Sequence, residues 1–213
     1  MSKEAVSGHV AQLAPVRLFP YETLHEVNER CIELLVNAAR SERTDTLPLV
    51  RHLREPLRHT NPEIRHRAAR RSVLLVDIAF HDGEWWRGVK LEPTRRRRSL
   101  VAQSGFPRRT AIPLARATLM LAWYAVKEDL DTATVLLGLS RPASEVIGGL
   151  QLSELDRIAE RRFRHVLPRW HDQPDYWCEL LEAARSGAEA ALRRCDIRGL
   201  QMIIGEHLHV GLS

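Results

Sequence analysis

The sequence has few cysteines, and their positions do not suggest a disulfide framework or a zinc site. Its three cysteines, Cys31, Cys178 and Cys195, lie far apart, and no CxxC pair occurs. An odd number at such wide spacing argues against both arrangements. We therefore expect three small thiols, buried or half-buried, in a protein of the reducing cytoplasm.

Long apolar runs are also lacking. The N-terminal residues contain no apolar stretch long enough for a signal peptide. The longest apolar runs, Val73–Val76 and Thr118–Val126, fall far short of the roughly 20 residues that a membrane-spanning helix needs. The sequence therefore predicts a soluble cytoplasmic protein with no membrane span.

Catalytic signatures are missing as well. The chain has no Walker loop, GxGxxG, GxSxG or HExxH motif. His52, His59 and His66 are the only histidines clustered by spacing, and their arginine neighbours disfavour a bound cation. Asp77 is the one acid in an apolar context, where a structural salt bridge to the nearby arginines is the favoured interpretation. We predict no enzymatic activity, metal or cofactor; a pocket of convergent acids or histidines would favour an enzyme instead.

The hydrophobic residues that are present follow a helical pattern. The segment 21–40 repeats apolar residues at steps of three and four, which predicts a helix with one buried face. Asn61 and Pro62 form the clearest helix start, as a cap and a first-turn proline. We expect that helix to continue through Phe80, although the β-branched run 72–80 is also compatible with a buried strand.

The second half predicts more helices, separated by short turns. An apolar helix from Ile112 ends near Asp129, and Asp131 is the expected cap of the next helix. Gly138 should close that helix, and Ser140 should cap the following one. Further breaks are expected at Gly148–Gly149, Pro168, Gly187 and Asp196, the last two dividing the C-terminal region into three short helices.

These patterns predict an all-α, multi-helix bundle with two helical subdomains joined by a basic loop. The boundaries that we infer are a flexible arm over 1–20, an N-terminal helical subdomain over 21–90, a basic linker over 91–108 and a C-terminal helical domain over 109–213. The linker is placed where charge, glycine and proline are concentrated. In the turn that precedes it, we expect one of Trp85 and Trp86 to fill the core.

Positive charge is concentrated in the middle of the chain. The net charge is +5, but residues 51–116 hold sixteen Arg and Lys against six Asp and Glu, a local net charge of +10. Such asymmetry is typical of a surface that meets a polyanion or an acidic partner, although a solvated loop could also carry it. The residues predicted to contact nucleic-acid phosphate are Arg67, Arg70, Arg71, Arg95, Arg96, Arg97, Arg98, Arg108 and Arg109.

A helix-turn-helix interpretation of residues 131–150 is weaker. The lengths of the two helices and the turn are plausible, but the second helix has only Arg141 among base-reading side chains and also carries Glu145. We expect that helix to serve packing or a subunit contact.

The segment Ile112–Trp170, 59 residues, resembles the FlhD subunit of the flagellar master activator. The likeness lies in the order of an apolar helix, a short helix ending in LGL, a small helix, and a helix with the spacing of Leu150, Leu152, Leu155, Ile158 and Ala159. The segment is also similar to FlhD-like proteins of conjugative elements and genomic islands. The resemblance implies a transcriptional co-activator that joins an FlhC-like partner on promoter DNA; the zinc cysteines of that system belong to the partner.

Two hypotheses follow. In the first, the protein is an oligomeric, DNA-associated regulatory subunit that binds duplex DNA together with a partner protein. In the second, it is a non-catalytic adaptor or scaffold of a secretion or conjugation assembly, and its basic segment meets an acidic protein.

Overall fold

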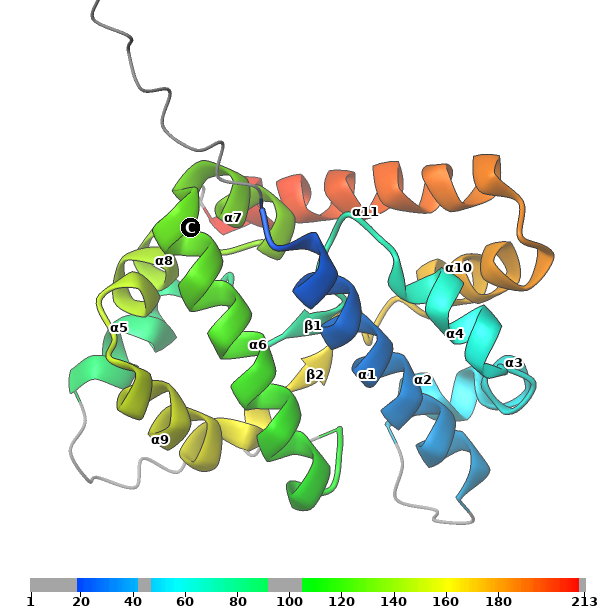
Figure 1. The fold of residues 1–213 in the computed structure, drawn as a ribbon, viewed down its shortest axis with the longest axis horizontal. Helices are drawn as coiled ribbons and strands as arrows, with labels where there is room; N and C mark the ends of the chain where they lie inside the picture. The colour runs from blue at the N-terminus through cyan, green and yellow to red at the C-terminus, as the bar shows by residue number, and fades with distance from the viewer. Residues whose placement is uncertain (1–18, 42–46, 92–104, 211–213) are drawn as a thin grey trace, which may run out of the picture.

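The computed structural model describes residues 19–41, 47–91 and 105–210, and it confirms the all-α prediction (Figure 1). The described residues form eleven α-helices, one short 3-10 helix and a sheet of two very short strands. The first four helices are α1 (Tyr21–Arg40), α2 (Pro48–His52), α3 (Arg54–Arg58) and α4 (Pro62–Ala69).

The N-terminal helices bury the faces that their spacing predicts. Along α1, the buried residues are Leu24, Val27, Asn28, Cys31, Ile32, Leu35, Val36 and Ala39. Leu49, Leu53 and Leu57 are also buried, and a turn at Leu53 separates α2 from α3. The amide of Ile64 donates to the Asn61 side chain, which confirms the predicted start of α4.

The expectation that α4 continues to Phe80 is wrong. The helix ends at Ala69, and the chain reaches strand β1 (Val76–Asp77), which pairs antiparallel with β2 (Leu167–Pro168). The physical reason is the fully buried side-chain amide of Asn28. It forms hydrogen bonds with backbone groups between Ala69 and Leu75 that would otherwise pair with one another inside a continuing helix. Its Nδ2 donates to the carbonyls of Ala69 and Val73, and its Oδ1 accepts from Leu75 N.

Helix α6 lies at the centre of the second half. It packs against α1 and against three successive helices of its own half, as Figure 1 shows. The bounds here are α5 (Gly83–Leu91), α6 (Arg108–Glu128), α7 (Leu130–Leu137), α8 (Arg141–Gly148) and α9 (Leu152–Arg162). Trp86 of α5 is fully buried, which confirms that one of the paired tryptophans fills the core.

Most of the turns between these helices lie where the sequence predicts them. Ser140 caps α8, Gly138 closes α7 in a left-handed conformation, and Gly149 ends α8 as expected. The cap of α7 is Asp129 rather than Asp131, because Asp129 has an extended backbone and accepts from Thr132 N. The helix predicted up to Pro168 stops earlier, at Arg162, and the 3-10 turn η1 (Phe163–His165) leads to β2.

The C-terminal region contains two helices, not three. They are α10 (Pro174–Ser186) and α11 (Glu189–Val210), separated at Gly187 as predicted. Asp196 does not break α11, because its carboxylate accepts from Ser72 N and from the Arg71 guanidinium, each at 2.8 Å. An aspartate expected to end a helix therefore ties the helix to the segment that follows α4.

A buried arginine joins four parts of the chain. Arg169 is 2% exposed, and its guanidinium donates to the carbonyls of Leu137 and Gly138. It lies 3.9 Å from a carboxylate oxygen of Asp77 and 3.8 Å from one of Glu206. Asp77 thus has the structural ion pair that its context predicts, but the arginine comes from after β2 and not from the neighbouring basic segment.

The core is continuous across the predicted subdomains. The buried hydrophobic cluster includes residues from each of the eleven described α-helices. Helix α1 packs against α6, α4 packs against α10, and β1 pairs with β2. Residues before and after the predicted linker therefore share one core, and most of the linker, 92–104, lies outside the described residues.

Gly138 offers a test of the Arg169 node. A Cβ at Gly138 would collide with the terminal nitrogens of Arg169, at a backbone φ of +63°. We expect Gly138→Ala to lower the free energy of unfolding by about 1–3 kcal/mol from backbone strain, with an added loss from displacing Arg169. Chemical denaturation followed by circular dichroism measures this.

Gly187→Ala is the matched control, since Gly187 also has a positive φ, +68°, and its Cβ would meet only an Arg67 side-chain end at 3.2 Å. We expect the Gly138 variant to be clearly the less stable of the two. Equal losses would show that Arg169 adjusts freely and does not hold the fold.

Candidate nucleic-acid interface

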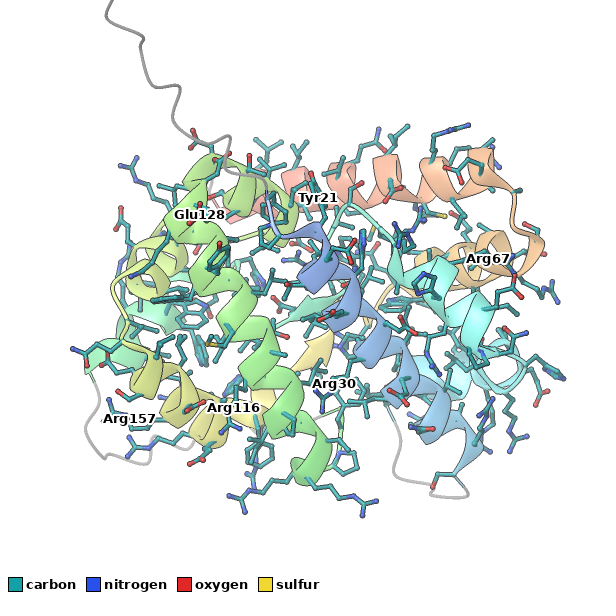
Figure 2. The ribbon with its side chains drawn as sticks, in the orientation of Figure 1. Tyr21, Arg30, Arg67, Arg116, Glu128 and Arg157 are labelled. Atoms are coloured by element: carbon teal, nitrogen blue, oxygen red, sulfur yellow. The ribbon has the colours of Figure 1, made fainter. Side chains whose placement is uncertain are left out.

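Of the nine arginines predicted to contact phosphate, the five that the structure describes do not form one surface. Arg95, Arg96, Arg97 and Arg98 lie outside the described residues. The other five are divided between α4 and the start of α6. Figure 2 shows Arg67 on the opposite side of the molecule from Arg116 of α6 and Arg157 of α9.

The arginines at the end of α4 are largely neutralised by the protein's own acids. Arg71 is 6% exposed and forms a 2.8 Å ion pair with Asp196. Arg67 pairs with Glu63 at 3.2 Å. Of this group only Arg70 is exposed without an ion pair among the described residues. The assignment of Arg71 to a phosphate contact is therefore corrected: its guanidinium is a buried structural group.

Arg108 and Arg109 occupy the first turn of α6, and both are exposed. The first turn contains no acid, and Pro107 provides no capping side chain. Two cations at the positive end of a 21-residue helix oppose the helix dipole. Backbone N–H groups and arginines at such an end favour a bound anion.

The structure adds two arginines and an aromatic ring that the sequence reasoning did not select. The 3-10 turn η1 packs against α6, and it brings Phe163 under the Arg108 guanidinium, 5.7 Å from the ring centre. The Arg164 guanidinium lies 5.8 Å from the same ring. Arg161, in the last turn of α9, is also exposed. The sequence could have indicated this site through residues 161–164, Arg-Arg-Phe-Arg, which combine basic side chains with an aromatic one.

We call Arg108, Arg109, Arg161 and Arg164 the basic end. None of the four forms an ion pair with any described residue. The nearest acids on α9 are already bound: Arg116 pairs with Asp156 at 2.5 Å and with Glu160 at 3.9 Å. The basic end therefore keeps a positive charge: its four arginines and Arg116, against Asp156 and Glu160, leave a local net charge of +3.

A second aromatic group adjoins η1. The His165 ring lies 4.9 Å from the Trp85 ring, and the Arg162 guanidinium lies 5.6 Å from the same tryptophan. Burial, and then the positive charge of Arg162, lower the pKa of His165 below its ordinary value of 6.5. His165 is therefore neutral at physiological pH and contributes packing rather than charge.

Helix α8 has the packing role that its composition suggests. It lies against α5 and α6, and its exposed positions are Arg141 and Glu145, which pair with each other at 3.2 Å. Such a helix presents few base-reading side chains.

The described residues contain no group of three or more His, Cys, Asp or Glu that could hold a metal ion. The three thiols are free, as expected, and burial raises the pKa of each of them. Within the described ranges, no helix combines the length and the apolar character needed to cross a membrane.

Comparison with known proteins identified no relative: no family model, no curated protein and no solved structure matches this chain.

The packing of His165 predicts a pH dependence. Its pKa is lower in the folded protein than in the unfolded chain, so the unfolded state binds more protons below about pH 6.5. The melting temperature should fall as the pH is lowered from about 7.5 to about 5.5. Burial also lowers the pKa values of His25 and His207, so we expect His165→Gln to reduce this fall without abolishing it.

His52→Gln serves as the control, because that side chain is exposed and should leave the pH profile unchanged. Thermal melts followed by circular dichroism measure both variants. A pH profile of His165→Gln identical to that of the parent protein would show that protonation of His165 does not oppose folding.

Proposed function

We propose that the protein is a non-catalytic, DNA-associated regulatory subunit, and that its basic end holds the phosphate backbone. The observation that carries this proposal is the gathering of Arg108, Arg109, Arg161 and Arg164 from two helices and a turn, without an ion pair to any described residue. Elsewhere, arginines such as Arg71 are neutralised by the protein's own acids.

The chemistry of the basic end suits phosphate. Guanidinium groups bind phosphate oxygens through paired hydrogen bonds and stay charged at any working pH. The start of α6 adds the positive end of a helix dipole, which an anion would stabilise. Arg95–Arg98, which precede α6 by about ten residues in the sequence, lie outside the described residues, and their predicted phosphate contact rests on the sequence alone.

The regulatory role rests on the likeness of residues 112–170 to the FlhD subunit. In this chain that segment contains most of α6 and all of α7, α8, α9 and η1, so it includes Arg161 and Arg164. We propose an FlhC-like partner protein that supplies base recognition, because α8 exposes too few polar side chains to read bases.

The double variant Arg108→Ala/Arg109→Ala tests the phosphate contact. Each lost contact should reduce the slope of log affinity against log salt by about 0.9, so we expect a slope shallower by about 2. Affinity for duplex DNA at low salt should also fall by about 10-fold or more. Fluorescence anisotropy with labelled duplex, with and without protein partners from the same cell, measures both quantities.

Arg87→Ala/Arg141→Ala is the matched control, since it removes the same charge from α5 and α8, where each arginine is exposed and pairs with a glutamate. Its salt slope should equal that of the parent. A parent affinity that does not change between low and physiological salt, or equal losses in both double variants, would contradict the proposal. A stable protein complex that purifies free of nucleic acid would instead favour the adaptor.

A further inference from the structure

Helix α11 carries large apolar side chains on its outer face. Figure 1 shows this helix along one edge of the molecule. Ile197 is 56% exposed, Ile204 is 52% exposed and Leu208 is 64% exposed. The opposite face of the helix is buried through Leu192, Cys195, Gly199 and Ile203. The outer apolar side chains therefore do not serve the core.

These exposed residues follow the spacing of a helix–helix seam. One line of exposed positions along α11, which we call the seam, consists of Ala190, Arg194, Ile197, Gln201, Ile204 and Leu208. Successive seam positions are four, three, four, three and four residues apart. Alternating steps of three and four are those of the a and d positions of a heptad, which pack against a second helix. An extended peptide would require a different spacing. The occupant that fits this face is thus another α-helix of comparable length.

The seam composition decides between the two orientations of a second α11. A parallel pair would bring Arg194 against its own copy, which places like charges in one layer. It would also bring Gln201 against its own copy, in a layer with no aliphatic side chain. An antiparallel pair can set Ile197 opposite Leu208 and Gln201 opposite Ile204. Every layer of that overlap then contains an aliphatic side chain, and Arg194 lies outside the overlap.

We propose that a second copy of this chain docks on this face, with the two α11 helices antiparallel about a twofold axis. Such an interface must be self-complementary. The antiparallel seam meets this condition, because the twofold axis places each Ile197 opposite the partner's Leu208 and each Gln201 opposite the partner's Ile204. The arginine and the glutamate between Ile197 and Leu208 are already paired within one copy: Arg198 lies 2.5 Å from Glu179, and Glu206 lies 3.8 Å from Arg169.

A groove beside the seam gives the partner room to approach. It has a volume of about 590 Å³ and lies between α10 and α11. Its lining includes the small residues Ala183, Ser186 and Ala191, together with Ile197 of the seam. Small side chains at this groove leave room for the end of the partner's α11, which reaches Ile197 in the antiparallel pair.

The test is the oligomeric state of the full chain and of Ile204→Glu/Leu208→Glu. Sedimentation equilibrium from about 1 µM to about 1 mM covers the range in which a modest interface associates. We expect the parent to form a dimer within this range and the double variant to remain a monomer. Because both side chains are exposed, the variant should keep the parent's circular dichroism spectrum and melting temperature at low concentration.

Met120→Glu/Leu152→Glu is the matched control, since these side chains are 39% and 52% exposed on α6 and α9. This variant should dimerise like the parent. A parent that stays monomeric at about 1 mM, a dimer that survives the α11 substitutions, or equal loss of the dimer in both variants would each overturn the proposal. DNA binding by monomeric protein would leave the proposed function intact, so the two proposals fail independently.

Discussion

The guanidinium of Arg169 is the contact on which the arrangement of the helices depends. Burying this charge is costly unless carbonyls and carboxylates surround it. The carbonyls come from Leu137 and Gly138 at the end of α7, and the carboxylates come from Asp77 in β1 and Glu206 in α11. One side chain therefore contacts a strand, a helix end and the C-terminal helix, and joins them to one another.

Two other polar side chains, the buried Asn28 and the half-buried Asp196, extend the same principle to the first half of the fold. Asn28 of α1 satisfies the backbone between Ala69 and Leu75, and Asp196 of α11 holds Arg71 and Ser72. The segment between α4 and β1 is thus bound from two sides by helices distant in sequence. These contacts explain why a β-branched run with helical neighbours does not form a helix here.

The distribution of paired and unpaired arginines separates structural from surface charge. The basic composition of residues 51–116 suggested a single cationic surface, but Arg67 and Arg71 are taken up by local and long-range ion pairs. Unpaired charge lies instead at the start of α6, where the guanidinium groups of Arg108 and Arg164 both lie against the Phe163 ring. Our proposal for DNA therefore depends on residues from the start of α6 and from the junction of α9 with η1, with α11 left free for a second copy.

The sequence by itself determined the elements that local chemistry controls. Asn61, Gly138 and Ser140 mark helix ends because caps and left-handed turns need only neighbouring backbone groups. The steps of three and four over residues 21–40 likewise identified the buried face of α1. The tertiary structure decided the helix ends and the surface cluster that depend on contacts between residues distant in the sequence. It ended α4 through Asn28, kept α11 continuous through Asp196 and gathered the basic end, because the partners of these groups are separated by about 40 residues or more in the sequence.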